Sequence, residues 1–189
     1  MVSTGAAFIC RFQTFDIGSR CEEFLEVFNC WLAILQEAFR DGEYSKDRTD
    51  KISKKLLGCE IDGSYIGLNS IYVIELLANM QAHIGEELKQ NYLKWLHNNG
   101  KSIGYTSVFL NRGLNNDFTE LYKVYFILSK YSCFKYEFEK ELNSLKEKRD
   151  RGGFWNFGKN FSCQKLLDDW RSLDRMKTDQ TVMCLCLYK

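Results

Sequence analysis

The sequence contains no proline, and this absence is the first guide to its fold. Chains built from β-sheets and long loops use proline freely at turns and edges, whereas a chain of long helices can do without it. With 189 residues, 45% of them hydrophobic, the chain is long enough to bury a substantial core. We therefore expect a mainly α structure, a single-domain helical bundle over residues 1–189 with long helices and at most a minor β element.

Net charge and long apolar runs are also lacking. The 26 basic and 25 acidic residues leave a net charge of +1, which argues against binding nucleic acid by bulk charge and leaves room only for local basic patches. No run reaches the roughly 18 apolar residues that a membrane span needs, and the first ten residues lack the basic start of an export signal. The sequence thus predicts a cytoplasmic protein, inside an infected host cell in one interpretation, that does not associate with membranes.

The chain has no Cys-x-x-Cys motif, although it contains eight cysteines. Most of them fall inside apolar helical patterns, which indicates buried free thiols in a reducing compartment. Cys163, Cys184 and Cys186 form the one conceivable zinc cluster, and their apolar setting favours core thiols instead. We expect no metal site and no cofactor. The cysteines are at positions 10, 21, 30, 59, 133, 163, 184 and 186.

Catalytic motifs are absent as well. The two histidines, His83 and His97, neighbour no Gly-x-Ser-x-Gly elbow, and the chain has no Gly-x-x-x-x-Gly-Lys loop. The acids Glu60, Asp62 and Glu87 only weakly resemble a metal-dependent nuclease site. We therefore predict a non-enzymatic binding protein without catalytic residues.

Apolar residues recur at helical spacing in four long segments, for which we expect helices near 19–40, 70–98, 117–150 and 162–176. Residues 117–150 include neither proline nor glycine and would form a single helix of roughly 50 Å from 116 to 151. Its last turns carry only Leu142 and Leu145 on a narrow apolar stripe, which is expected to meet a partner or solvent. This stripe predicts a homo-oligomer, most simply a dimer.

Shorter features give weaker indications. Gly85 interrupts the segment 70–98 and marks either a bend or close helix packing. Residues 1–15, a hairpin at Asp62-Gly63 and residues 101–110 are candidates for extended structure. The apolar tail 182–188 is expected to be buried as a strand or at a subunit interface.

The first candidate RNA-binding surface is a predicted helix over residues 46–57. Arg48, Lys51 and Lys55 stand at i, i+3 and i+7 and so share one face, which suits spaced contacts to phosphates. Residues 46–55 include five cations against two acids. The alternative is an ordinary solvated helix face, which such runs of charge usually form.

The second candidate surface is a glycine-broken loop over residues 149–161 that combines cations with aromatic residues. Arg149, Arg151 and Lys159 are placed to hold phosphates, and Trp155 to stack on a base. Alternatively, the aromatic side chains of this loop simply fill the gap between two helices.

A proline-free, mainly helical chain of 22.2 kDa with patchy basic faces and no catalytic motif resembles the small RNA-silencing suppressors of crinivirus-type plant viruses. The resemblance is one of size and character over the whole chain. It implies that a helical oligomer sequesters double-stranded RNA without chemistry. The alternative is a protein–protein inhibitor, a viral or phage accessory protein that blocks a host or defence enzyme through an exposed apolar patch.

Overall fold

The computed structural model describes residues 21–61, 67–115, 117–158 and 173–188, and within these ranges the chain is mainly helical, as the sequence predicts. The described residues contain no extended β-strand, and the minor β element reduces to one parallel bridge between Ser70 and Gly104. The helices are α2 (Cys21–Ala38), α3 (Lys46–Leu57), α4 (Ile71–Asn79), the 3-10 helix η2 (Gln81–His83), α5 (Glu86–Asn98), the 3-10 helix η3 (Leu110–Asn115), α6 (Phe118–Leu128), α7 (Phe134–Glu137), α8 (Glu139–Glu147) and α9 (Leu173–Cys186).

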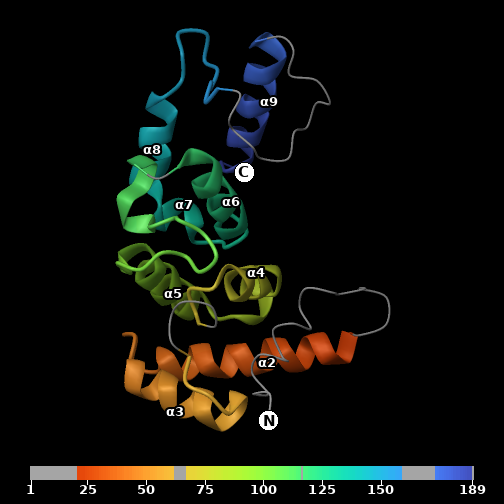
Figure 1. Ribbon diagram of the computed structural model, residues 1–189, viewed down its shortest axis with the longest axis vertical. Helices are drawn as coiled ribbons and strands as arrows, with labels where there is room; N and C mark the ends of the chain where they lie inside the picture. The colour runs from red at the N-terminus through yellow and green to blue at the C-terminus, as the bar shows by residue number, and fades with distance from the viewer. Residues whose placement is uncertain (1–20, 62–66, 116, 159–172, 189) are drawn as a thin grey trace.

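The helices stack along the long axis of the molecule (Figure 1). α2 and α3 pack together at one end, α4 and α5 form the middle, and α6, α7 and α8 follow, with α9 beside α8 towards the other end. A hydrophobic cluster continues through this stack and includes Trp31 of α2, Tyr92 of α5, Tyr125 of α6 and Trp155 after α8. Among the helices of the described ranges, none is long and apolar enough to cross a membrane.

The structure confirms helices within two of the predicted ranges, 19–40 and 46–57. In α2 the side chains of Val27, Trp31 and Leu35 are buried at helical spacing. In α3 the Ser45 hydroxyl accepts a hydrogen bond from the Arg48 amide at the first turn, and Gly58 ends the helix with a left-handed φ of 72°.

The single helix predicted over 70–98 is wrong, because it breaks between α4 and α5. Gly85 has an extended backbone, with φ −60° and ψ 145°, and stands immediately before α5. A Cβ added at Gly85 would meet nothing within 4 Å, so the glycine marks a bend and not close helix packing. The break allows Met80 and Ile84 to turn towards the core.

The helix predicted over 117–150 also breaks, although nothing in its sequence is a strong helix breaker. α6 ends at Leu128, where the Ser129 hydroxyl donates to the Phe126 carbonyl at 2.8 Å, and the chain bends again at Phe138 (φ −115°, ψ 23°). A straight helix with apolar side chains on every face would need other helices to cover it, and the described part of the chain does not supply them. Folding back instead packs Phe134 and Phe138 against Tyr125, with ring centroids 5.8 and 5.5 Å apart.

This folding back covers the stripe from which an oligomer is predicted, so the stripe itself no longer supports one. Leu142 and Leu145, the predicted exposed stripe, are buried within the chain itself. The Tyr188 hydroxyl donates to the Leu142 carbonyl at 2.7 Å, which holds the C-terminal turn over α8.

The tail is helical, so the strand predicted for residues 182–188 is wrong. α9 buries Met176, Gln180 and Met183, and the buried Leu187 follows in the turn after it. These residues recur at three- and four-residue steps and give the helix its inner face. The polar Gln180 in this series hides the pattern from a hydrophobicity count. Three other predictions lie outside the described residues: the extended segment 1–15, the hairpin at 62–63 and most of the helix 162–176.

Candidate functional site

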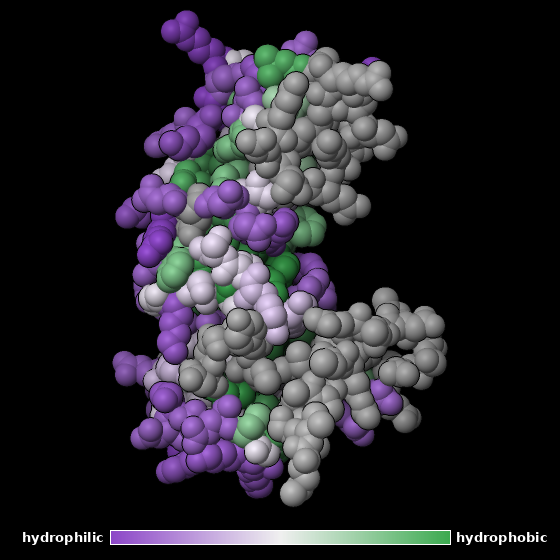
Figure 2. Space-filling model, viewed as in Figure 1, coloured by the Kyte–Doolittle hydropathy of each residue, from purple (hydrophilic) through white to green (hydrophobic). Residues whose placement is uncertain are grey.

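The two predicted RNA-binding surfaces do not come together. α3 lies at one end of the stack, and the loop that follows α8 lies at the other (Figure 1). Hydrophilic side chains run along one side of the molecule from one end to the other in the space-filling view (Figure 2). Each surface must therefore be judged by itself.

Arg48, predicted to bind phosphate, uses its side chain for contacts within the chain. Its Nε donates to the Glu37 carbonyl at 3.1 Å, and one terminal nitrogen donates to the Glu43 carbonyl at 3.3 Å. The other terminal nitrogen forms an ion pair with Asp41. The Arg48 side chain is only 20% exposed and ties α3 to the end of α2.

The rest of the α3 stripe is a solvated surface. Lys51 and Lys55 are exposed, whereas Lys54 forms an ion pair with Glu60. Lys46 lies 3.8 Å from Asp50. Two exposed lysines on one convex helix fit the alternative of an ordinary charged face at least as well as a phosphate-binding stripe.

Trp155, predicted to stack on a base, is 0% exposed in the structure. Its indole nitrogen donates to the Leu145 carbonyl at 2.7 Å, and the Arg149 guanidinium covers the ring at 4.1 Å from the centroid. The ring also stacks on Tyr188. For Trp155 the structure supports the alternative, in which the aromatic side chain fills a gap between helices.

The loop after α8 is held in place by Asp150. One carboxylate oxygen accepts hydrogen bonds from the amides of Gly152 and Phe154 at 2.9 and 3.0 Å, and the other pairs with Lys177 of α9 at 2.8 Å. The Lys177 ammonium, helped by the Phe154 amide, holds the pKa of Asp150 below its usual range. Arg151 is exposed at this loop, while Lys159 lies outside the described residues.

Between α7, α8 and the C-terminal turn lies an open groove of about 560 Å³, which we call the α8 groove. Three cations, Lys135, Lys146 and Arg149, line it together with the rings of Tyr136 and Tyr188. The Lys146 ammonium lies 5.0 Å from the centroid of the Tyr188 ring, and the Tyr136 side chain is 74% exposed. The further lining residues that are described are Glu139, Leu142, Asn143 and Leu185.

Of the predicted site residues that the structure describes, only Arg149 lines this groove. Lys135 and Tyr136 come from the turn of helix that the predicted rod misplaces, and Tyr188 comes from the tail expected to be a strand. In the sequence, the neighbouring pair Lys135-Tyr136 places a cation beside an aromatic residue, and this is a signal that could have indicated the groove. No sequence signal brings Tyr188 beside Lys146.

Chemistry beyond binding finds little support among the described residues. No group of three or more His, Cys, Asp or Glu side chains there could hold a metal ion. Cys30, Cys59, Cys133, Cys184 and Cys186 are free of disulfides. Burial raises the pKa of Cys133 to about 11, so this thiol is not a nucleophile at neutral pH. Glu60, one of the acids weighed for a nuclease site, pairs with Lys54.

Comparisons with known proteins give no further guide, because no family model, no curated protein and no solved structure matches this chain.

Proposed function

We propose that this protein is a non-enzymatic RNA-binding protein and that the α8 groove contacts the RNA. The observation that carries the proposal is the convergence of Lys135, Lys146 and Arg149 with two tyrosine rings on one open groove. Cations beside exposed aromatic rings are the combination that holds a sugar–phosphate backbone while bases stack. Glu139 is the one acid among the described lining residues.

The groove favours unpaired RNA over a duplex. Stacking on Tyr136 needs a base that is free of its partner strand, whereas a duplex is contacted through spaced phosphates and 2′-hydroxyls. The expectation of duplex binding from the sequence depended on cations that the structure places at opposite ends of the molecule. Sequestration of small RNA by a viral silencing suppressor is one use to which such binding could be put.

The test is a fluorescence polarisation titration with labelled single-stranded and duplex RNA at two salt concentrations. The double variant Lys135→Ala and Lys146→Ala removes two groove cations, and Lys51→Ala with Lys55→Ala removes the same charge from α3. We expect the groove variant to bind single strands at least about tenfold more weakly, with a salt slope lower by about 0.7 for each lost phosphate contact. The α3 variant should retain nearly the wild-type affinity.

Two results would contradict the proposal. Equal losses in the two double variants would mean that affinity follows net charge and not the groove. No binding of either RNA at low salt would exclude the function outright.

The alternative, a protein–protein inhibitor, is favoured by a separate observation. Val182 and Leu185 lie one turn apart on α9 and are each 44% exposed, and Leu173 at its start is 54% exposed. Val182 and Leu185 lie on one face of α9 and form a small apolar strip that a host protein could cover. Val182 does not line the groove, so Val182→Ser should leave RNA binding intact if the groove is the functional site, and should weaken capture of a host protein if the strip is.

A homo-oligomer remains part of the proposal, with less support than the sequence alone gave it. A dimer would present the groove twice and raise the apparent affinity for a long RNA through effective concentration. Light scattering at micromolar concentration measures this directly, and a monomer mass would remove the dimer from the proposal.

A further inference from the structure

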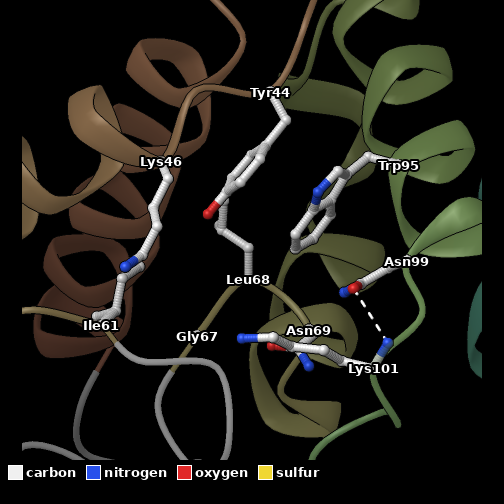
Figure 3. Close-up of a pocket in the computed structure, with 9 residues that line it drawn as sticks. All are labelled: Tyr44, Lys46, Ile61, Gly67, Leu68, Asn69, Trp95, Asn99 and Lys101. Atoms are coloured by element: carbon white, nitrogen blue, oxygen red, sulfur yellow. Dashed lines mark hydrogen bonds between the residues drawn. The ribbon is translucent and has the colours of Figure 1, made fainter.

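A separate cavity of about 200 Å³ lies away from the α8 groove, where the start of α3 meets the end of α5 (Figure 3). Its described sides come from four stretches of chain. These are Tyr44 and Lys46 before and at the start of α3, Ile61 after α3, Gly67 to Asn69 before α4, and Trp95, Asn99 and Lys101 at and after the end of α5. None of the elements that build the α8 groove contributes to it.

The apolar side of the cavity is rigid. The rings of Tyr44 and Trp95 stack with centroids 4.6 Å apart and an interplanar angle of 28°. Phe39 supports both rings from behind, with centroids at 5.7 and 6.0 Å. Leu68 is 2% exposed, and its carbonyl accepts a hydrogen bond from the buried Tyr92 hydroxyl. The wall is therefore formed before any ligand arrives.

The polar side of the cavity is cationic. Of the described residues that line it, two are lysines and none is acidic. The ammonium groups of Lys46 and Lys101 approach the cavity from two different sides (Figure 3). The Lys46 ammonium nitrogen pairs with a carboxylate oxygen of Asp50 at 3.8 Å, and the Lys46 side chain remains 71% exposed. This ion pair is therefore weak enough to open.

Neutral donors complete the polar side. The Asn99 side-chain oxygen accepts a hydrogen bond from the Lys101 amide at 3.2 Å, which leaves the amide nitrogen of Asn99 on the cavity side (Figure 3). The Tyr44 hydroxyl points into the same space (Figure 3). Burial raises the pKa of Tyr44 against the effect of a hydrogen bond with the Thr49 side chain, so its phenol keeps its proton at neutral pH.

We propose that this cavity binds a small phosphate monoester, with Lys46, Lys101 and Asn99 holding the phosphate and the organic group against Trp95. Two ammoniums and neutral donors match a dianion with three terminal oxygens. The aromatic wall requires an organic substituent and disfavours free phosphate. Pockets for drug-sized ligands have volumes of about 300–1,000 Å³, so a cavity of this volume admits a short ester and excludes a whole nucleotide.

The experiment is isothermal titration calorimetry of the full chain with phenyl phosphate as the probe. One molecule should bind per chain, and it should raise the unfolding temperature. Phenol lacks the phosphate and so tests the contribution of the negative charge. Inorganic phosphate lacks the ring and tests the contribution of the aromatic group. Adenosine monophosphate is a larger phosphate ester and tests whether the size of the cavity limits binding. We expect each of the three to bind at least about tenfold more weakly than phenyl phosphate.

Two variants locate the binding. Asn99→Asp keeps the oxygen that accepts from the Lys101 amide and replaces the amide nitrogen by negative charge, while Lys101→Ala removes one ammonium. Each should weaken binding of phenyl phosphate at least about tenfold. Asn29→Asp, on an exposed face of α2, adds the same charge elsewhere and should leave the affinity unchanged.

The proposal stands independently of RNA binding and is overturned by any of four results. These are no saturable binding of phenyl phosphate, equal affinity for phenol, tighter binding of adenosine monophosphate, and wild-type affinity in both cavity variants. If Asn99→Asp fails to fold, as judged by its circular dichroism, Lys101→Ala decides the question alone, because its side chain is exposed.

Discussion

The α3 surface and the α8 groove contain similar numbers of cations but arrange them differently. On α3 the cations project from one convex helix, and the most buried of them, Arg48, holds the end of α2. In the groove, Lys135 comes from α7, Lys146 from α8 and Arg149 from the loop, and Tyr188 of the C-terminal turn completes the wall. The difference shows that a concave site needs several elements to meet, whereas a stripe on one helix rarely forms one.

The largest expected effect of a substitution is at Trp155, because the packing at the groove end of the molecule depends on its side chain. Trp155→Ala should lower the free energy of unfolding by about 3–5 kcal/mol, because it empties a fully buried site and deletes the bond to the Leu145 carbonyl. Urea unfolding followed by circular dichroism measures this loss.

Trp155→Phe separates packing from recognition. It keeps a ring in the core, loses the indole hydrogen bond and should cost about 1–2 kcal/mol. RNA affinity of this folded variant should equal that of the wild type. A variant of normal stability that no longer binds RNA would show that Trp155 does stack on a base, although it is buried and Tyr136 is exposed.

A smaller effect tests the α3 side. Arg48→Ala should destabilise the protein by about 1–2 kcal/mol, since the side chain makes two hydrogen bonds to carbonyls and one ion pair at the end of α2. Lys51→Ala, one turn along the same helix and exposed, should change stability by less than about 0.5 kcal/mol.

Arg48→Lys sharpens the same comparison. The lysine keeps the charge near Asp41 but cannot reproduce the fork of hydrogen bonds, so most of the destabilisation should remain. Recovery of full stability in Arg48→Lys would mean that charge alone matters at this position, and that the hydrogen bonds to the Glu37 and Glu43 carbonyls contribute little.

Sequence periodicity predicted the helical class and the inner face of α2, because each inward residue there is apolar. It failed where a helix has to end without a breaker. Nothing in the sequence around Ser129 or Phe138 stops a helix, and the bends exist because Tyr125, Phe134 and Phe138 bury one another when the chain folds back. Such tertiary preference is invisible to a one-dimensional pattern.

The groove was missed for a related reason. Its residues are spread from Lys135 to Tyr188, and only the fold brings them together. Arg48 and Trp155, both predicted to contact RNA, make hydrogen bonds within the chain. Long side chains that combine an apolar body with several donors serve equally well to tie segments together, and sequence alone does not separate the two uses.

The smallest effect concerns a contact between two helices, made by His97 of α5 and Glu141 of α8. The ring nitrogen Nε2 of His97 lies 2.8 Å from a Glu141 carboxylate oxygen, and both side chains are largely covered, at 25% and 13% exposure. The hydrogen bond to Glu141 raises the pKa of His97 above 6.5 against the opposing effect of burial, with Glu137 adding to the rise. Burial acts to raise the pKa of Glu141, but the bond from His97 leaves it below 4.5.

These directions fix the pH dependence. A histidine whose pKa is higher in the folded state stabilises the protein fully below about pH 6.5, and this stabilisation is lost as the pH rises through the folded pKa. The Glu141 contribution is present above about pH 4.5 and is lost as the pH falls through its lowered pKa. His97→Gln should therefore cost on the order of 1 kcal/mol near pH 6 and clearly less near pH 9. Glu141→Gln tests the partner, and in a double-mutant cycle the coupling between the two positions should shrink over the same rise in pH. A coupling that grew from pH 6 to pH 9 would show that the effect of burial on the pKa of His97 exceeds that of the Glu141 carboxylate, so that His97 is neutral in the folded protein. In that case α5 and α8 would be held together here by packing of His97 against Phe138 and not by charge.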